Sequence, residues 1–203
     1  MFRFRTFIKD LSSIRVSLII SALLFAMGIT VGWVQSGAIQ ELILEEIKKL
    51  GGISKKLMQS EAPELSFFII IFLNNSIKSI LVLFSGILFG IFPIVFLVMN
   101  GLFIGFLLNL EHTLGGNLSE MIFKGLLPHG IIEIPVLLIA AAYGLSLGGL
   151  VFKSIVARDG RGSGISGNWR DFGRKSVTAS LWIVVLLFVA AVIESTITLW
   201  LMS

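Results

Sequence analysis

The sequence predicts an all-α, polytopic membrane helix bundle with five transmembrane helices and a short extracytoplasmic amphipathic helix. Apolar residues make up 56% of the 203 residues and charged residues only 14%. The mean hydropathy of +0.98 lies far from that of soluble domains. Several uncharged windows reach the roughly 20 residues that a helix needs to cross a bilayer core of about 30 Å. The alternation of apolar and polar residues that is typical of membrane β-strands is missing. We therefore expect the membrane spans to be helices.

The whole chain is expected to form one integral membrane domain. The uncharged run 16–40 is too long for a signal-peptide core of about 7 to 15 residues, so we expect the first span to be retained. The uncharged run 79–110 is too long for one span, and Gly90 with Pro93 should break it into a tight hairpin. The predicted spans are 14–35, 65–89, 92–110, 128–152 and 176–201.

The segment 39–50 has the pattern of an amphipathic helix. Its apolar residues share one face, Glu45 stands four residues before Lys49, and Gly51 with Gly52 should end the helix. We expect it to lie outside the membrane and to cover its own bundle. Resting on the membrane surface or contacting a partner protein are the alternatives.

The segment 153–175 is predicted to be a flexible cytoplasmic loop rich in Gly, Ser and Arg, whose arginines contact anionic lipid headgroups. Its GSGISG stretch, 162–167, matches a dinucleotide-binding pattern. That pattern is meaningful only between a strand and a helix, and neither flank supports a nucleotide-binding unit. A nucleotide site is therefore not expected.

The basic residues predict the orientation. Ten of the 16 Lys and Arg residues, including every Arg, fall on the side of the N-terminus. The positive-inside rule then predicts a multi-pass protein of the cytoplasmic membrane, with a cytoplasmic N-terminus and an extracytoplasmic C-terminus. The net charge of +4 does not indicate nucleic acid, because no binding motif or aromatic-basic surface accompanies it.

Glycine pairs at a spacing of four residues occur in the first four predicted spans. Glycine at this spacing clears a groove on one helix face, so that a neighbouring backbone can approach closely. We therefore expect a tight bundle or a homo-oligomer, with a dimer favoured. The pairs are Gly28/Gly32, Gly86/Gly90, Gly101/Gly105 and Gly144/Gly148.

Polar residues inside the spans predict an intramembrane polar pocket. A charged group at bilayer depth costs about 2.5 to 3.5 kcal/mol on insertion scales, so it normally faces the bundle interior, water or a partner. Counting from the span ends places Asn74, Asn100 and Glu133 in the outer half of the membrane, where they can share one pocket. The predicted pocket comprises Asn74, Asn75, Lys78, Asn100, His129 and Glu133.

Glu133 is expected to have a partner on another helix. Either the long side chain of Lys78 or an asparagine amide can reach it. His129 shares its helix face, and Pro135 should kink the span and expose backbone carbonyls. The His129 and Glu133 pair can relay protons or hold a cation, or these residues can serve only to fix helix register.

The sequence does not indicate enzymatic chemistry. It has no cysteine, two histidines, no HExxH and no GxSxG motif, so we predict no catalytic residue, metal site or cofactor. A membrane-embedded hydrolase is therefore the third of three candidate functions.

Four segments together resemble the stage II sporulation protein M family of integral membrane proteins. The histidine–glycine element followed by glutamate–isoleucine–proline is the most specific feature, and the double asparagine supports it. The segments are LNNSIKS (73–79), SGILFGIFP (85–93), NGLFIGFLL (100–108) and LPHGIIEIP (127–135). The family's motif positions match Asn74, Asn75, Asn100, Gly101, His129, Gly130, Glu133 and Pro135.

The resemblance implies a role without catalysis, because the family's namesake anchors a membrane complex with peptidoglycan-degrading proteins in spore-forming bacteria. We therefore predict a non-enzymatic membrane scaffold or assembly factor in cell-envelope remodelling. Its expected partners are the lipid bilayer, further copies of the chain and other envelope proteins. The alternative is a transporter or channel-like component for an ion, small solute or lipid, which would use the Glu/His/Asn pocket.

Overall fold

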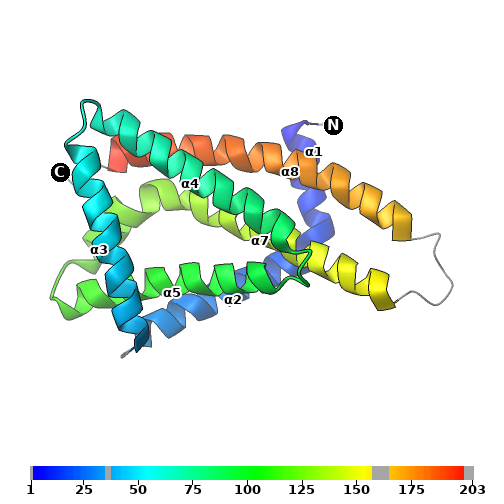
Figure 1. The fold of residues 1–203 in the computed structure, drawn as a ribbon, viewed down its shortest axis with the longest axis horizontal. Helices are drawn as coiled ribbons and strands as arrows, with labels where there is room; N and C mark the ends of the chain where they lie inside the picture. The colour runs from blue at the N-terminus through cyan, green and yellow to red at the C-terminus, as the bar shows by residue number, and fades with distance from the viewer. Residues whose placement is uncertain (1, 35–37, 157–164, 199–203) are drawn as a thin grey trace.

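The computed structural model describes residues 2–34, 38–156 and 165–198 as an all-α bundle (Figure 1). The predicted fold class is confirmed, and the chain is a multi-pass membrane protein. Five helical stretches within the described residues are long and apolar enough to cross a membrane. They are Phe4–Val34, Pro63–Ser85, Ile91–Thr113, Gly130–Val156 and Gly167–Thr196.

The first span begins with a short amphipathic helix. α1 (Phe4–Leu11) leads through the 3₁₀ turn η1 (Ser12–Ile14) into α2 (Arg15–Val34). α1 packs on α8, where Phe7 is only 1% exposed and the rings of Phe4 and Trp182 are 4.8 Å apart. α1 is absent from the predicted elements, because a helix of 8 residues is marginal until such packing stabilises it.

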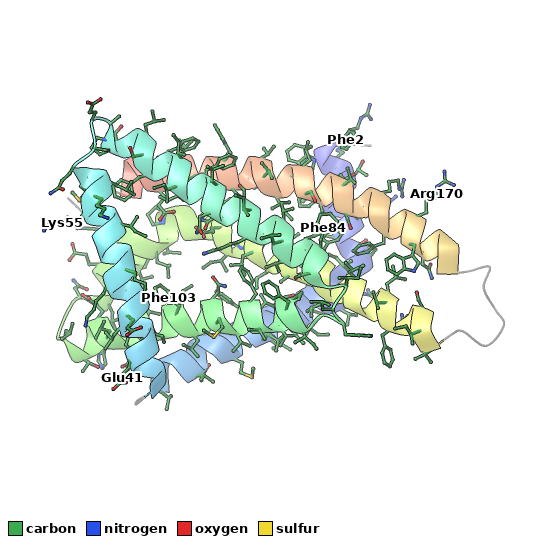
Figure 2. The ribbon with its side chains drawn as sticks, in the orientation of Figure 1. Phe2, Glu41, Lys55, Phe84, Phe103 and Arg170 are labelled. Atoms are coloured by element: carbon green, nitrogen blue, oxygen red, sulfur yellow. The ribbon has the colours of Figure 1, made fainter. Side chains whose placement is uncertain are left out.

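α3 (Ala38–Met58) is the predicted amphipathic helix, and it is longer than expected. The predicted end at Gly51 and Gly52 is wrong, since both lie inside the helix. A helical glycine costs only about 1 kcal/mol relative to alanine, and the helix formers that follow continue the hydrogen bonding. Ile43 packs against α5, so α3 covers its own bundle. Figure 2 shows the labelled Glu41 and Lys55 of α3 at the opposite end of the bundle from Phe2 and Arg170.

α4 (Pro63–Ser85) and α5 (Ile91–Thr113) form a hairpin with a tight turn. Gly90 in this turn has a φ of 76°, which glycine adopts without steric penalty. Phe89 has a φ of 56°, which is strained for a residue with a side chain. The turn therefore falls where the sequence predicted the long apolar run to break.

Two π-helical segments flank the last two spans. α6 (Leu118–Glu120) and the π-helix η2 (Met121–Leu126) precede α7 (Leu127–Val156). α8 (Ile165–Ile193) continues into the π-helix η3 (Glu194–Thr198).

The predicted loop 153–175 is wrong in part. α7 continues to Val156 and α8 begins at Ile165, whereas 157–164, with the first half of the GSGISG stretch, lie outside the described residues. The first turns of α8 are polar, and Asp171 forms ion pairs with Arg174 and Lys175 at helical spacing. Such pairs support a helix beyond its apolar part.

The predicted glycine pairs lie in helix contacts within the chain. A Cβ on Gly32 would lie 2.1 Å from the carbonyl oxygen of Leu102, and a Cβ on Gly86 would lie 1.8 Å from that of Gly144. Glycine is therefore needed where α2 meets α5 and where the end of α4 meets α7. Because these contacts are internal, they provide no evidence for a dimer, which stays a prediction. The other glycines in these contacts are Gly28, Gly90, Gly101, Gly105 and Gly148.

Candidate intramembrane binding site

A partly open cavity of about 710 Å³ lies between the helices and is bordered by all five spans. α4, α5 and α7 supply most of its wall, and α2 and α8 contribute Phe25 and Leu187. Most of the lining side chains are apolar, with a few polar groups among them, which is the usual form of a small-molecule site. The polar side chains are those of Asn74, Asn75, Lys78, Ser79, Asn100, Glu133 and Glu194. Five of the six predicted pocket residues thus share one space.

A hydrogen bond between α4 and α7 forms the centre of the site. Asn75 donates from Nδ2 to Oε1 of Glu133 over 2.9 Å. Asn74 donates in turn to Oδ1 of Asn75 over 3.2 Å, which holds the Asn75 amide with its NH₂ group toward the acid. Of the two partners expected for Glu133, the structure shows the asparagine. A hydrogen bond to a charged group contributes about 1.5 to 3 kcal/mol.

The other predicted residues take different positions. Lys78 lines the cavity, but no ion pair joins it to Glu133 among the described contacts. Asn100 also lines the cavity, yet it donates within its own helix to the carbonyl of Phe96 over 2.7 Å. The backbone of His129 belongs to α7, whereas its side chain lies outside the described part of the structure.

The predicted kink residue, Pro135, lies inside α7, which continues as an α-helix through it. Its side chain is exposed and is not part of the cavity wall. Proline removes one backbone donor from the helix, so a backbone carbonyl one turn earlier loses its usual partner. Pro135 lies two residues after Glu133 in the same span.

Glu194 belongs to the site but is not among the predicted pocket residues. It lines the same cavity as Glu133. The sequence carried a signal for it, because Glu194 is an acid inside the predicted span 176–201. The rule that identified Glu133 as a buried charge applies to Glu194 equally.

Both π-helical segments border this cavity. η2 contributes Met121, Gly125 and Leu126, and η3 contributes Glu194. π-helical turns are rare and occur frequently at functional sites, because they shift side chains out of the regular helical register. Their presence at two edges of one cavity supports its assignment as the functional site.

The charged groups of the cavity can bind a cation or an amine, or exchange a proton. Two glutamates and one lysine give the lining a formal charge of −1. Among the residues that the structure describes, no group of three His, Cys, Asp or Glu side chains is placed to hold a metal ion. The apolar walls add affinity for a guest with an apolar part.

Comparison with known proteins places the site in a family. The family described as Stage II sporulation protein M matches residues 21–199. The chain belongs to this family. The match confirms the resemblance drawn from the four sequence segments, and it covers every residue of the cavity wall.

One relative of this sporulation protein M family member is the uncharacterized protein MJ0793 of Methanocaldococcus jannaschii. The two are 28% identical over 134 residues, which cover 66% of this chain and 68% of the relative. No solved structure matches the chain. The family is thereby known, and the role of the cavity has to be argued from its own chemistry.

Proposed function

We propose that this family member is a non-enzymatic membrane protein that binds a small-molecule ligand, its guest, in the intramembrane cavity. It moves this guest across or within the bilayer. The single observation that supports this proposal is the cavity itself, which combines apolar walls with the acids Glu133 and Glu194. The excess of acid over base favours a guest that carries a positive charge. The apolar lining favours a guest that is otherwise apolar, so an amphipathic cation fits best.

Flux measurements on the reconstituted full chain test this proposal. A pH gradient would be imposed across the membrane of the proteoliposomes. The accumulation of ethidium, a fluorescent amphipathic cation, inside them would then be followed over time. We expect Glu133→Gln to lower the initial rate at least tenfold, because it removes one of the two acidic charges. Glu64→Gln is the matched control, since Glu64 is an exposed acid of α4 outside the cavity. Equal rates for the two variants, or no flux in the unaltered protein, would contradict the proposal.

A second candidate function is the scaffold or assembly factor of envelope remodelling, and the surface of α3 favours it. The apolar face of α3 is turned to its own bundle, and its exposed side chains include Glu41, Glu45, Lys55 and Lys56. Such a charged ridge across one end of the bundle suits a water-soluble domain of a partner protein.

The two functions predict opposite responses to two variants. Under the scaffold function, Lys55→Glu with Lys56→Glu should remove an envelope protein from complexes purified from native membranes, whereas Glu133→Gln should leave those complexes unchanged. Under the transport function, the α3 variant should retain flux and Glu133→Gln should lose it. Unfolding curves of both variants provide the control for folding.

A further inference from the structure

A second cavity lies at the end of the bundle that bears α1, away from the intramembrane site. It has a volume of about 570 Å³ and lies between the α1–η1 segment and the polar start of α8. We call it the basic cleft. Its lining residues are Arg5, Thr6, Lys9, Asp10, Ser12, Ser13, Asp171, Arg174 and Lys175. No apolar side chain is among them, so the lining suits a polar ligand group.

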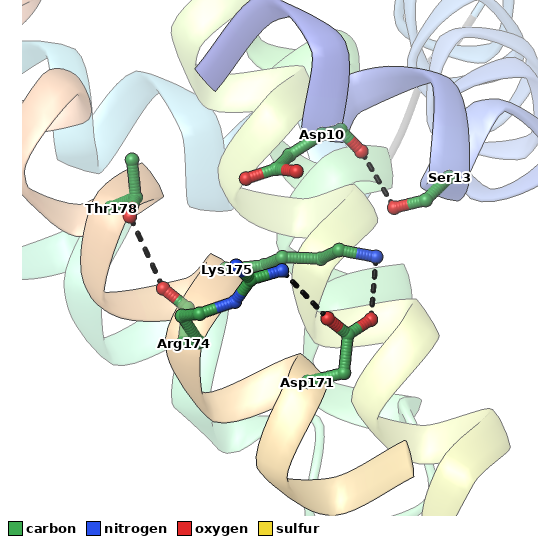
Figure 3. A network of polar contacts seen from close by, with 6 residues as sticks. All are labelled: Asp10, Ser13, Asp171, Arg174, Lys175 and Thr178. Carbon is green, nitrogen blue, oxygen red and sulfur yellow. Dashed lines mark hydrogen bonds and ion pairs between the residues drawn. The ribbon is translucent and has the colours of Figure 1, made fainter. Parts of the chain in front are cut away.

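The basic cleft carries unneutralised positive charge. Its four basic and two acidic residues give a formal charge of +2. Figure 3 shows how Asp171 is shared, since Arg174 donates to Oδ1 over 3.1 Å and Lys175 to Oδ2 over 2.6 Å. Arg5 and Lys9 form no ion pair among the described contacts. Their charges are therefore available to an anion.

The available hydrogen-bond donors also suit an anion. The hydroxyls of Ser12 and Ser13 already donate to the backbone carbonyls of Lys9 and Asp10, each over 2.6 Å. An arginine has five N–H donors and a lysine has three. The pairs with Asp171 use only part of this capacity, so the guanidinium and ammonium groups keep free donors around the cleft. Such groups bind phosphate through charge-assisted hydrogen bonds.

The surroundings of the basic cleft indicate that this anion belongs to a lipid. Trp182 donates from Nε1 to the backbone carbonyl of Phe2 over 3.2 Å, and tryptophan is enriched at the boundary between membrane and water. Val177 and Leu181 follow Arg174 by three and seven residues, so they continue its helix face, and they are 50% and 44% exposed. A phosphate at Arg174 therefore has an apolar surface for acyl chains directly beside it.

We propose that the basic cleft binds the phosphate-bearing headgroup of an anionic phospholipid, whose acyl chains lie along α8. The headgroup bridges α1 to the start of α8 and so fixes the amphipathic helix at the membrane surface. This site is independent of the intramembrane cavity and of the guest proposed for it. The basic cleft lies on the side predicted to be cytoplasmic, where anionic lipids attract basic groups near the membrane.

Lipid titration of the full chain, followed by native mass spectrometry in detergent, tests this site. Phosphatidylglycerol and phosphatidylcholine with identical acyl chains would be compared, because they differ in headgroup charge. Arg5→Gln with Lys9→Gln removes two basic charges, and Lys48→Gln with Lys124→Gln, at two exposed lysines outside the cleft, is the matched control. We expect the cleft variant to bind phosphatidylglycerol about 30-fold more weakly, from roughly 1 kcal/mol for each basic residue, and the control variant to bind like the unaltered chain.

Three results would overturn the proposal: equal binding of phosphatidylglycerol by the cleft and control variants, equal binding of the two lipids by the unaltered chain, or binding of free glycerol phosphate as tightly as the lipid. The last result would assign the cleft to a soluble anion. Arg5→Lys with Lys9→Arg preserves both charges and should retain lipid binding, which separates charge loss from misfolding.

Discussion

Substitution of Gly105 by alanine tests the central helix contact of the fold. A Cβ at this position would lie 2.0 Å from the carbonyl oxygen of Ile29, whereas ordinary van der Waals contact begins at 3.4 Å. The backbones of α2 and α5 would have to separate by about 1.4 Å, the difference of these two distances. Overpacking of this kind costs about 1 to 3 kcal/mol, because separated surfaces lose dispersion contacts.

Gly149→Ala is the matched control for this experiment. Gly149 lies in α7, and a Cβ there would meet nothing within 4 Å. Alanine should stabilise that helix position by about 1 kcal/mol, since glycine has the lower helix propensity. Gly105 is helical too, so the same gain applies to both variants, and their free energies of unfolding should differ by the overpacking cost of about 1 to 3 kcal/mol. Reversible unfolding in mixed micelles, followed by circular dichroism, measures this difference.

The reasoning would be refuted if Gly105→Ala and Gly149→Ala had the same free energy of unfolding. It would also be refuted if Gly105→Ala changed only the oligomeric state, because the glycine groove would then serve a contact between chains. Gly32→Ala, which meets the carbonyl of Leu102 on the other side of the same crossing, should reproduce the loss of stability.

Three further predictions use the same unfolding assay. Tyr143→Phe should raise the free energy of unfolding by about 1 kcal/mol, because the buried Tyr143 hydroxyl has no hydrogen-bond partner in the described structure; a decrease would show that the hydroxyl is bonded. Phe89→Gly should also raise it by about 1 kcal/mol, since it removes the strain of a φ of 56°, and no gain would contradict that strain. Asn75→Leu should lower it by about 2 kcal/mol by leaving Glu133 without its amide partner, and addition of Glu133→Leu should recover most of the loss.

The five spans could be predicted because the bilayer imposes one simple requirement on the sequence. About 20 consecutive apolar residues are needed for each crossing, and a run that is too long must turn. The length of the run 79–110 required a break, and Gly90 with Pro93 indicated its position. The contacts of the glycine pairs could not be assigned, because a groove on a helix fits another helix of the same chain as well as one of a second chain.

The features that the sequence did not reveal depend on tertiary contact. α1 needs the surface around Trp182 before its eight residues form a stable helix. The choice of Asn75 over Lys78 as partner of Glu133 depends on the rotation of α4 against α7, since both positions lie on one helix face. The π-helical segments involve shifts in hydrogen bonding that residue spacing does not encode. Glu194 differs from these, because its acidic side chain within a span was visible in the sequence.

The surroundings of Glu133 bear on whether this acid only fixes helix register or also serves the proposed function. An acid that only fixed the register of two helices would be closed in by side chains on every side, since an unfilled space beside it forfeits packing contacts. Glu133 instead has Asn75 bonded to Oε1, no described hydrogen bond at its other oxygen, and a cavity of about 710 Å³ beside it. Oε1 is thus held by the fold, and we propose that the other carboxylate oxygen binds the ligand.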